Sequence, residues 1–565
     1  MKEKFKDRET LLWIYKGSKS EFLKIFAVIA ARTLLTVLGV YFAVSSKGVI
    51  DAAQKGDKNL LISKSVLLIL IILVQILIKF FGNSVEERIK ARLEMNFKSK
   101  LFSSVLKKDY SRITSYHSGD LLARLSSDIS VVSDGIISLV PGIVSMLAGL
   151  FCAFFALVAL DKTFALVFLG GGIILMGIIN LFRKFLKNMH KKVQETDSKV
   201  RSFFQEAISS LLMIKIFSIE EKMSERGKLL QDENFAAKMK KRNISIAANS
   251  GLTFIFSFAS LFALLRCAFR LYAKTITFGT LTAVIQLVSQ IQSPVAGLSL
   301  VLPVYFNILA SAERIIEIEN LPDEKCEEKM LEQKDYDNLK SLDFENITFS
   351  YGRDNVLKNA SCKIEKGDFV IISGISGIGK STLMKLLLGV IHPEEGKIYL
   401  EMQNGEKVFA GKHIRQLFSY VPQGNLLMSG TIKDTVSMIG ENISEEEIEK
   451  AAEVACAADF IKQLPNGLET VIGEKGAGLS EGQVQRLAVM RAVLSKAPII
   501  LLDEATSALD EETEEKLLAN IKNLKNKTCI LISHKKAAYS ICEKELKIED
   551  KKIYLNKIGD EQNEG

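Results

Sequence analysis

The sequence predicts two parts of different fold class, a helical membrane domain followed by a soluble α/β domain. Three observations lead to this expectation. At 565 residues the chain is too long for a single hydrophobic core. Its long apolar runs almost all lie before residue 305. Beyond that point, strand-like runs such as Ser341–Phe349 alternate with helical ones, which is typical of an α/β domain.

Six segments have the length and composition of membrane-spanning helices, which need about 20 mostly apolar residues. They are Phe22–Val44, Ile62–Gly82, Ile136–Leu160, Thr163–Phe182, Ala247–Tyr272 and Ile276–Pro303. The connections 83–135 and 183–246 are long, polar and helical in periodicity, with few glycines or prolines. We therefore expect them to extend the spanning helices into the cytoplasm, each pair ending in a short connecting helix.

Positive charge sets the expected orientation. Lysines and arginines gather in the N-terminal stretch and in the two long connections, whereas the short turns near Asp161 and Ala273 carry one lysine each. By the positive-inside rule the N-terminus and both long connections are cytoplasmic, so six crossings return the chain to the cytoplasm. We expect a multi-pass protein of the plasma membrane. The net charge of +8 fits cytoplasmic loops and does not indicate a nucleic-acid partner.

Other compositional signals exclude several classes. The seven cysteines are scattered without a C-x-x-C pair, which argues against a disulfide framework or a zinc site. The charged N-terminus does not have the features of a signal peptide. An acidic, proline-containing stretch around Glu317–Asp337 separates the two halves. We place the membrane domain at 1–316, a linker at 317–340, the α/β domain at 341–558 and a polar tail at 559–565.

A glycine-rich loop after the apolar strand Phe369–Ser373 carries the strongest chemical signal. It opens a helix, and its glycines allow backbone N–H groups to surround phosphate groups. In this spacing the lysine reaches the β- and γ-phosphates and the following serine binds Mg²⁺. The loop residues are Gly374, Ile375, Ser376, Gly377, Ile378, Gly379, Lys380, Ser381 and Thr382.

A second apolar strand, Ile499–Leu502, ends in two acids, Asp503 and Glu504. A carboxylate at the end of a buried strand beside a phosphate loop is suited to Mg²⁺. The next carboxylate is placed to act as the general base for an attacking water.

Two further motifs, Leu479-Ser-Glu-Gly-Gln483 and Ser507-Ala-Leu-Asp510, together with the phosphate loop resemble the ATP-binding cassette. Six N-terminal helices before one cassette is similar to the half-transporter layout of ABC exporters, the type IV exporter fold. The remaining family motifs occur in the expected order: the adenine-stacking aromatic at Tyr351, the glutamine at Gln423, the exporter-specific loop Gly473-Glu474-Lys475-Gly476, and the switch histidine at His534.

The resemblance implies a mechanism. ATP and Mg²⁺ are the expected cofactors, with Ser381, Gln423 and Asp503 at the metal and Glu504, Gln423 and His534 at the reacting phosphate. In this family a second half-transporter completes each ATP site through its signature residues, here Ser480, Gly482 and Gln483. The implied function is ATP-driven export of an amphipathic substrate, a lipid, peptide or drug-like molecule, by alternating access. An importer or a gated channel with the same architecture remains an alternative.

The signature departs from the family at Glu481, where glycine is usual. Two interpretations stay open. The residue is a tolerated variant in a homodimer, which we favour, or this chain pairs with a different half-transporter whose ATP site is degenerate.

Two cytoplasmic segments resemble the coupling helices of exporters. The first is Ser115–Leu122, followed by Arg124 and Asp128, and the second is Ile208–Ile219, which in this family reaches the partner's cassette.

We expect four basic residues to lie inside the bilayer: Arg32, Lys79, Arg266 and Arg270. Charges inside a bilayer commonly face water or a cavity. We hypothesise a basic cavity for an anionic or amphipathic substrate; the alternative is that these side chains reach the membrane surface.

Overall fold

The computed structural model describes residues 2–164, 167, 189, 192–324, 329–352, 354–424, 427–440, 443–473 and 476–558. Contacts within the chain divide it into two compact units. Unit 1 comprises Met1–Ser103 and Ser118–Glu319, and unit 2 comprises Ser104–His117 and Asn320–Gly565. The short segment Ser104–His117 thus packs with the C-terminal unit although it follows the second predicted span. The domain boundaries proposed above stay predictions.

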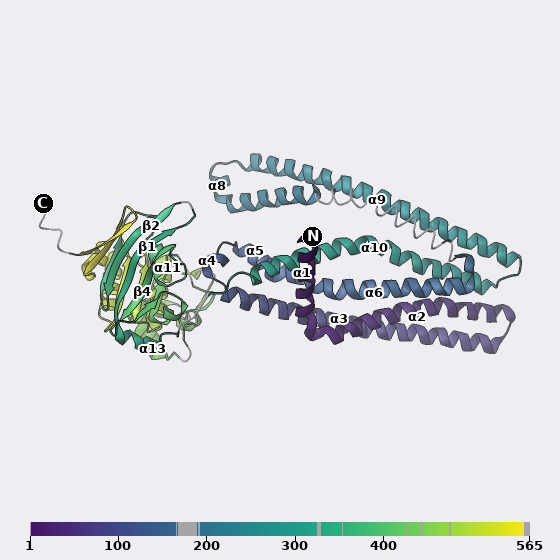
Figure 1. Ribbon diagram of the computed structural model, residues 1–565, viewed down its shortest axis with the longest axis horizontal. Helices are drawn as coiled ribbons and strands as arrows, with labels where there is room; N and C mark the ends of the chain where they lie inside the picture. The colour runs from purple at the N-terminus through teal and green to yellow at the C-terminus, as the bar shows by residue number, and fades with distance from the viewer. Residues whose placement is uncertain are drawn as a thin grey trace. The chain divides into compact units, whose positions relative to one another are not determined.

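Unit 1 is built from long helices that run beside one another, with the N-terminal helix directed across them (Figure 1). The elements are α1 (Lys2–Ser18), η1 (Lys19–Glu21), α2 (Phe22–Lys55), α3 (Lys58–Lys107, leaving unit 1 after Ser103), α5 (Ser118–Ala123), η2 (Arg124–Asp128), α6 (Ile129–Leu160), α8 (Leu211–Ile216), α9 (Glu220–Tyr272) and α10 (Phe278–Glu319). The 50 residues of α3 correspond to about 75 Å at 1.5 Å per residue. A bilayer core of about 30 Å is far shorter, so the helices extend well beyond it, as the polar connections predict.

Four helical stretches among the described residues are long and apolar enough to cross a membrane: Arg8–Lys55, Lys58–Lys107, Ser118–Leu160 and Glu220–Tyr272. They contain the first, second, third and fifth predicted spans. Helix α10 covers the sixth. The fourth predicted span, Thr163–Phe182, lies almost entirely outside the described residues.

Small residues bring the helices of unit 1 close together. A Cβ atom on Gly135 of α6 would lie 2.1 Å from Cδ1 of Ile308 on α10. One on Gly149 of α6 would lie 2.4 Å from Cγ2 of Thr36 on α2. At both positions glycine is required for the helices to approach this closely.

Unit 2 contains a six-stranded sheet and a four-stranded antiparallel sheet. The larger sheet has the order β12-β11-β3-β10-β9-β6, parallel except for β12, and the smaller has the order β2-β1-β4-β5. The strands are β1 (Leu339–Ser350), β2 (Asn355–Glu365), β3 (Phe369–Ser373), β4 (Glu395–Met402), β5 (Lys407–Phe409), β6 (Phe418–Val421), β7 (Gly430–Thr431), β8 (Val471–Ile472), β9 (Ile499–Asp503), β10 (Thr528–Ile532), β11 (Lys544–Glu549) and β12 (Lys552–Lys557). Strands β7 and β8 form a separate antiparallel pair.

Unit 2 also contains short helices, most of which connect its strands. They are α4 (Tyr110–Ile113), η3 (Gln333–Asn338), α11 (Lys380–Leu387), η4 (Lys412–Leu417), α12 (Ile432–Ser437), α13 (Glu445–Val454), α14 (Ala458–Gln463), η5 (Gly467–Glu469), α15 (Glu481–Leu494), α16 (Glu511–Lys522) and α17 (Lys536–Ile541). Strand β3 is buried at every position. Phe369 and Ile371 belong to one hydrophobic core and Val370 and Ile372 to the other, so both faces of the sheet are covered.

The strand order determines which loops meet. Strands β3, β10, β9 and β6 are parallel neighbours, so their carboxyl ends lie along one edge of the sheet. Ligands of open α/β sheets bind at this edge. The residues that follow these four strands are Gly374, Ser533, Glu504 and Pro422. The phosphate loop, the switch histidine, the acidic pair and the glutamine are therefore brought together.

Candidate active site

The phosphate loop joins the end of β3 to helix α11 through three glycines with positive φ. Gly374, Gly377 and Gly379 have φ values of 140°, 81° and 113°, which L-residues rarely adopt. A Cβ on Gly379 would also lie 2.3 Å from Cγ1 of Val356, and one on Gly374 would lie 2.8 Å from the carbonyl oxygen of Ile548. The loop conformation thus requires glycine at two positions for both backbone and packing reasons. Ile375, Ser376 and Ile378 lie between them, the first two exposed.

Lys380 begins helix α11 and its side chain returns to the loop. Its Nζ donates to the carbonyl oxygen of Gly374 at 2.8 Å and lies 2.9 Å from Nε2 of His534. Lys380 is buried at 6% exposure, whereas His534 is exposed. The loop lysine and the switch histidine, 154 residues apart in sequence, therefore face the same point.

Asp503 ends β9 next to the first turn of α11. Its Oδ1 accepts from the hydroxyl of Ser381 at 3.0 Å, and its Oδ2 accepts from the hydroxyl of Tyr420 at 3.1 Å. Burial raises the pKa of the Asp503 carboxyl, against the effect of these two bonds, and the Glu504 charge raises it further. Burial and the Asp503 charge raise the pKa of Tyr420 as well. Thr382, next to Ser381, is buried in the helix.

These oxygen atoms suit Mg²⁺. The ion prefers hard oxygen ligands and commonly uses one or two protein groups together with substrate phosphates. The Ser381 hydroxyl and the Asp503 carboxylate already converge, so the donor set fits. Tyr420 is a site residue that the sequence motifs did not identify. The signal for it is its position on a strand beside β9, three residues before Gln423.

Glu504 and Gln423 also meet. Nε2 of Gln423 donates to Oε2 of Glu504 at 2.7 Å. Glu504 has φ of 52°, a left-handed conformation that is uncommon for a non-glycine residue. Its backbone N–H donates to the carbonyl oxygen of Ile532 at the end of β10. Such strain often occurs at functional sites and here turns the chain sharply after the buried strand.

The signature motif caps helix α15. Ser480 is the N-cap: its hydroxyl accepts from the N–H of Gln483, and the Gln483 side chain accepts from the N–H of Ser480. A Cβ on Gly482 would lie 2.9 Å from the carbonyl oxygen of Ala508. Glu481 is exposed in the first turn, where a negative charge favours the helix dipole.

A glutamine missed by sequence analysis connects the signature helix to the loop after Glu504. The Gln485 amide donates to the hydroxyl of Ser507 at 2.9 Å and accepts from the N–H of Ala508 at 3.0 Å.

A buried ion pair holds the other side of the same loop. The Glu514 side chain is fully buried and lies 3.1 Å from Nζ of Lys535. Lys535 also donates to the carbonyl oxygens of Thr506 and Leu509. Because Lys535 directly follows His534, this pair ties the switch segment to the loop.

The remaining predicted site residues are Tyr351 and the exporter-specific loop. Tyr351 follows β1 with an exposed ring, 59% accessible, packed edge-on against Phe349 at 4.9 Å. An exposed ring of this kind can stack on a base. Glu474 and Lys475 of the predicted exporter-specific loop lie outside the described residues.

Both predicted coupling segments are largely exposed. In unit 2, the helix α4 precedes Ser115, and Asp109 caps it by accepting from the N–H groups of Ser111 and Arg112. Within unit 1, the second segment contains helix α8 and exposes large apolar side chains in and beside this helix. These are Ile208, Leu211, Leu212, Met213, Ile216 and Phe217, each more than half exposed.

The basic residues of the spans do not form a bare positive cavity. Arg32 forms an ion pair with Glu86 of α3. Arg266 and Arg270 both pair with Asp161, at 3.1 and 2.9 Å. Each of these three arginines therefore has an acidic partner, Glu86 within α3 or Asp161 directly after α6, and none is an unpaired positive charge.

A cavity in unit 1 lies elsewhere. It has a volume of about 640 Å³ between α2, α6 and α10. Its lining contains no ionisable side chain among the described residues: Thr36, Gly39, Val40, Ser138, Leu139, Gly142, Ile143, Ser145, Met146, Gly149, Gln290, Val301 and Val304.

Comparisons with known proteins agree with this arrangement. The family model of the ABC transporter transmembrane region matches residues 25–295, and that of the ABC transporter matches residues 357–507. The chain is 32% identical over 540 residues to a putative export ATP-binding/permease protein of Rickettsia bellii, covering 92% of this chain and 89% of that protein. It is 27% identical over 505 residues to the ATP-dependent lipid A-core flippase of Escherichia coli K12, covering 88% and 86%.

A solved structure shares the fold. A bacterial Atm1-family ABC exporter with ATP bound superposes with a TM-score of 0.78 over 96% of each chain, at 22% sequence identity.

Proposed function

This chain belongs to the ABC exporters, with an N-terminal transmembrane domain fused to a C-terminal ATPase, and from that premise we propose that it exports an amphipathic substrate as a homodimer. ATP hydrolysis by the cassette drives the transport. The proposal depends chiefly on one observation: the phosphate loop, the acidic pair, Gln423 and His534 converge at the carboxyl edge of one parallel sheet.

Each polar group has a proposed role in hydrolysis. Lys380 and the loop amides bind the β- and γ-phosphates, and His534 contacts the γ-phosphate. Glu504 accepts a proton from the attacking water, and Gln423 orients the Glu504 carboxylate and this water. Ser381, Asp503 and Gln423 would hold Mg²⁺, which when bound neutralises phosphate charge. Tyr351 stacks on the adenine.

The dimer follows from the signature motif. Ser480, Gly482 and Gln483 lie at the start of α15, some distance in sequence from the phosphate loop of the same chain. We propose that they complete the ATP site of a second copy. The exposed apolar side chains of α8 support a contact with the partner, because a patch of this kind commonly marks an interface.

The substrate path is proposed to include the uncharged cavity between α2, α6 and α10. Its lining supports an apolar portion of the substrate, such as an acyl chain, since no described ionisable group would have to be desolvated there. The proposed orientation, with the N-terminus and the cassette in the cytoplasm of a plasma-membrane protein, rests on the distribution of basic residues.

Glu504→Gln in the purified full-length chain tests the proposal. We expect hydrolysis to fall by about 10²–10⁴, the contribution typical of a general base. ATP binding should persist, and the ATP-bound protein should stay dimeric in size measurements. Glu512→Gln, the same substitution at an exposed position of α16, is the matched control. Hydrolysis unchanged in Glu504→Gln would contradict the assignment.

A heterodimer is the second candidate, favoured specifically by Glu481. The same experiment distinguishes the two, because a Glu504→Gln chain that binds ATP but stays monomeric indicates a different partner. Vesicle transport with ATP on a known side would separate export from import.

A further inference from the structure

The chain passes between the two units at three points: after Ser103, after His117 and after Glu319. These passages are the covalent connections through which a movement that ATP produces in unit 2 can reach unit 1. Charged side chains of unit 1 connect the ends of the three segments that begin or finish there. The segments are α3, the α5–η2 stretch and α10.

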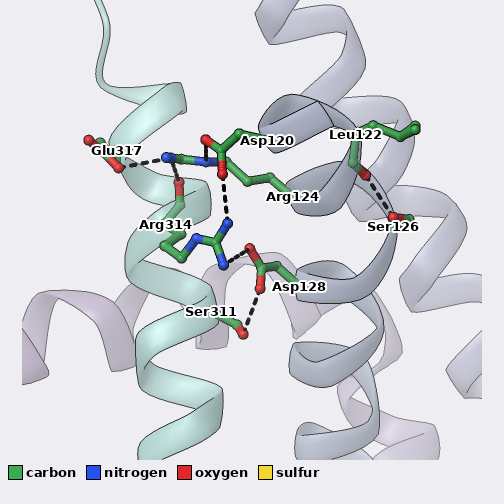
Figure 2. A network of polar contacts seen from close by, with 8 residues as sticks. All are labelled: Asp120, Leu122, Arg124, Ser126, Asp128, Ser311, Arg314 and Glu317. Atoms are coloured by element: carbon green, nitrogen blue, oxygen red, sulfur yellow. Dashed lines mark hydrogen bonds and ion pairs between the residues drawn. The ribbon is translucent and has the colours of Figure 1, made fainter. Parts of the chain in front are cut away.

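Arg124 is at the centre of these connections (Figure 2). Its side chain is only 7% exposed. Its Nε donates to Oδ2 of Asp120 at 2.9 Å and its Nη1 to Oε2 of Glu317 at 2.8 Å. A third bond goes to the backbone carbonyl of Arg314. A guanidinium with several donors in a fixed plane can hold these acceptors together, which a lysine could not reproduce.

A second arginine completes the network from the other side. Nη2 of Arg314 donates to Oδ1 of Asp120 at 2.8 Å, and its Nη1 lies 3.4 Å from Oδ2 of Asp128. The hydroxyl of Ser311 donates to Oδ1 of the buried Asp128 at 2.9 Å. As Figure 2 shows, the acids come from the α5–η2 side except Glu317, and the arginines come from both sides.

The backbone under this network is unusual. The residues from Arg124 to Asp128 form a π-helical segment, which is rare and frequently marks a functional position. The two buried charged residues, Arg124 and Asp128, are its first and last residues. The network thus fixes the wider turn that leads into α6.

The first passage, which follows the unit 1 part of α3, is tied to the same end of α10. Nζ of Lys100 on α3 lies 3.0 Å from a carboxylate oxygen of Glu319. Glu319 also accepts from Nε1 of Trp13 at 2.7 Å, and the Trp13 ring stacks on Phe97 with centroids 5.2 Å apart. Trp13 is the only tryptophan of the chain.

We propose that these ion pairs and hydrogen bonds form a strut, a rigid connection that joins the ends of α3, the α5–η2 stretch and α10 within unit 1. Arg124 is its positioning residue and makes α6 and α10 move together when ATP binds. This rests on the proposed function, since it describes how that ATP site acts on the membrane helices. Because Glu319 ends the strut and holds Trp13, the fluorescence of Trp13 reports its movement.

Arg124→Gln tests the strut in the full-length protein, reconstituted in vesicles of phosphatidylethanolamine and phosphatidylglycerol. Wild-type protein should show a change in Trp13 emission on addition of ATP and Mg²⁺. In Arg124→Gln we expect that change to be lost, while ATP affinity stays within about twofold, as for a residue remote from the site. Arg124→Lys should restore the change only in part. Arg88→Gln, at an exposed position of α3, should behave as wild type.

Glu317→Gln is a second variant that should not disturb folding, because the Glu317 side chain is 53% exposed. This substitution removes one charged partner of Arg124 and leaves Arg124 itself in place. It should weaken the change, and adding it to Arg124→Gln should have no further effect. A full Trp13 response in Arg124→Gln, or no response in wild-type protein that binds ATP, would overturn the strut. Loss of ATP binding in the wild-type protein would instead refute the proposed function.

Discussion

Replacement of Gly379 by alanine should disable the phosphate loop by an amount that the structure allows us to divide into two parts. The first part is backbone strain, since φ of 113° is outside the range of L-residues and such strain costs about 1–3 kcal/mol. The second is overpacking, because the new Cβ would lie 2.3 Å from Cγ1 of Val356; overpacking costs about 1–3 kcal/mol. The nucleotide-free variant can relieve this cost by changing the loop conformation, whereas ATP binding requires the original conformation. The sum, about 2–6 kcal/mol, therefore corresponds to roughly 30-fold to 10⁴-fold weaker ATP binding at 1.4 kcal/mol per tenfold.

Two matched variants isolate these parts. Gly377 has φ of 81° but no atom within 4 Å of an added Cβ, so Gly377→Ala introduces strain alone. Gly367, in the turn before β3, has φ of 88° and equally open surroundings, and Gly367→Ala applies similar strain outside the site. Gly379→Ala should bind ATP more weakly than Gly377→Ala by about 5-fold to 140-fold, the overpacking part.

The assay is titration of the full-length protein with a fluorescent ATP analogue. Gly367→Ala should bind the analogue as wild type does. Val356→Ala removes the Cγ1 atom, so adding it to Gly379→Ala should restore binding to the level of Gly377→Ala. The reasoning fails if this double variant binds no better than Gly379→Ala, or if Gly377→Ala is as weak as Gly379→Ala.

Three other predictions concern the same domain. Asp503→Asn should stop hydrolysis yet raise the thermal midpoint of the nucleotide-free protein, because burial raises the pKa of this carboxyl and its ionised form opposes folding. The increase in thermal midpoint should be complete at neutral pH. It should vanish below the pKa that Asp503 has in the unfolded chain, as measured by thermal scans at a series of pH values. Glu481→Gly should lower stability by about 0.3–1 kcal/mol, the value of an acid at a helix N-terminus, and a large rise in ATPase rate would show that Glu481 repels the phosphates. Gln485→Ala should slow hydrolysis more than it weakens ATP binding, since Gln485 holds Ser507 and Ala508 and not the phosphate loop; equal effects on both would contradict this role.

Local features of the site could be predicted from sequence because a few consecutive residues determine them. The loop from Gly374 to Ser381 is one strand–turn–helix unit, and its glycine spacing is sufficient to indicate phosphate binding. The helix cap formed by Ser480 can also be predicted from the local sequence. Ser480-Glu-Gly-Gln483 has the S-x-x-Q spacing of a capping box, and the structure contains this box.

Pairings between distant residues could not be predicted in the same way. That Lys380 meets His534 and Gln423 meets Glu504 depends on the order β3-β10-β9-β6, which no local pattern encodes. The ion pairs of Asp161 in unit 1 could not be predicted from local sequence either.

Asp161 lies in a short turn by sequence, yet it forms ion pairs with both Arg266 and Arg270 about 105 residues later. The basic residues of the predicted spans, taken without such partners, therefore overestimate the free positive charge. The polar network of Arg124 went unnoticed for a similar reason, since its partner Glu317 is 193 residues away.

The contacts among the active-site side chains have a consequence for how quickly products leave. Lys380 donates to Gly374 and faces His534, Ser381 donates to Asp503, and Gln423 donates to Glu504. An arriving triphosphate must exchange these bonds for its own, so each new bond adds only a small net free energy. The same exchange runs in reverse after hydrolysis, when the side chains rejoin one another and help to expel ADP. Internal pairing of this kind favours turnover over tight retention.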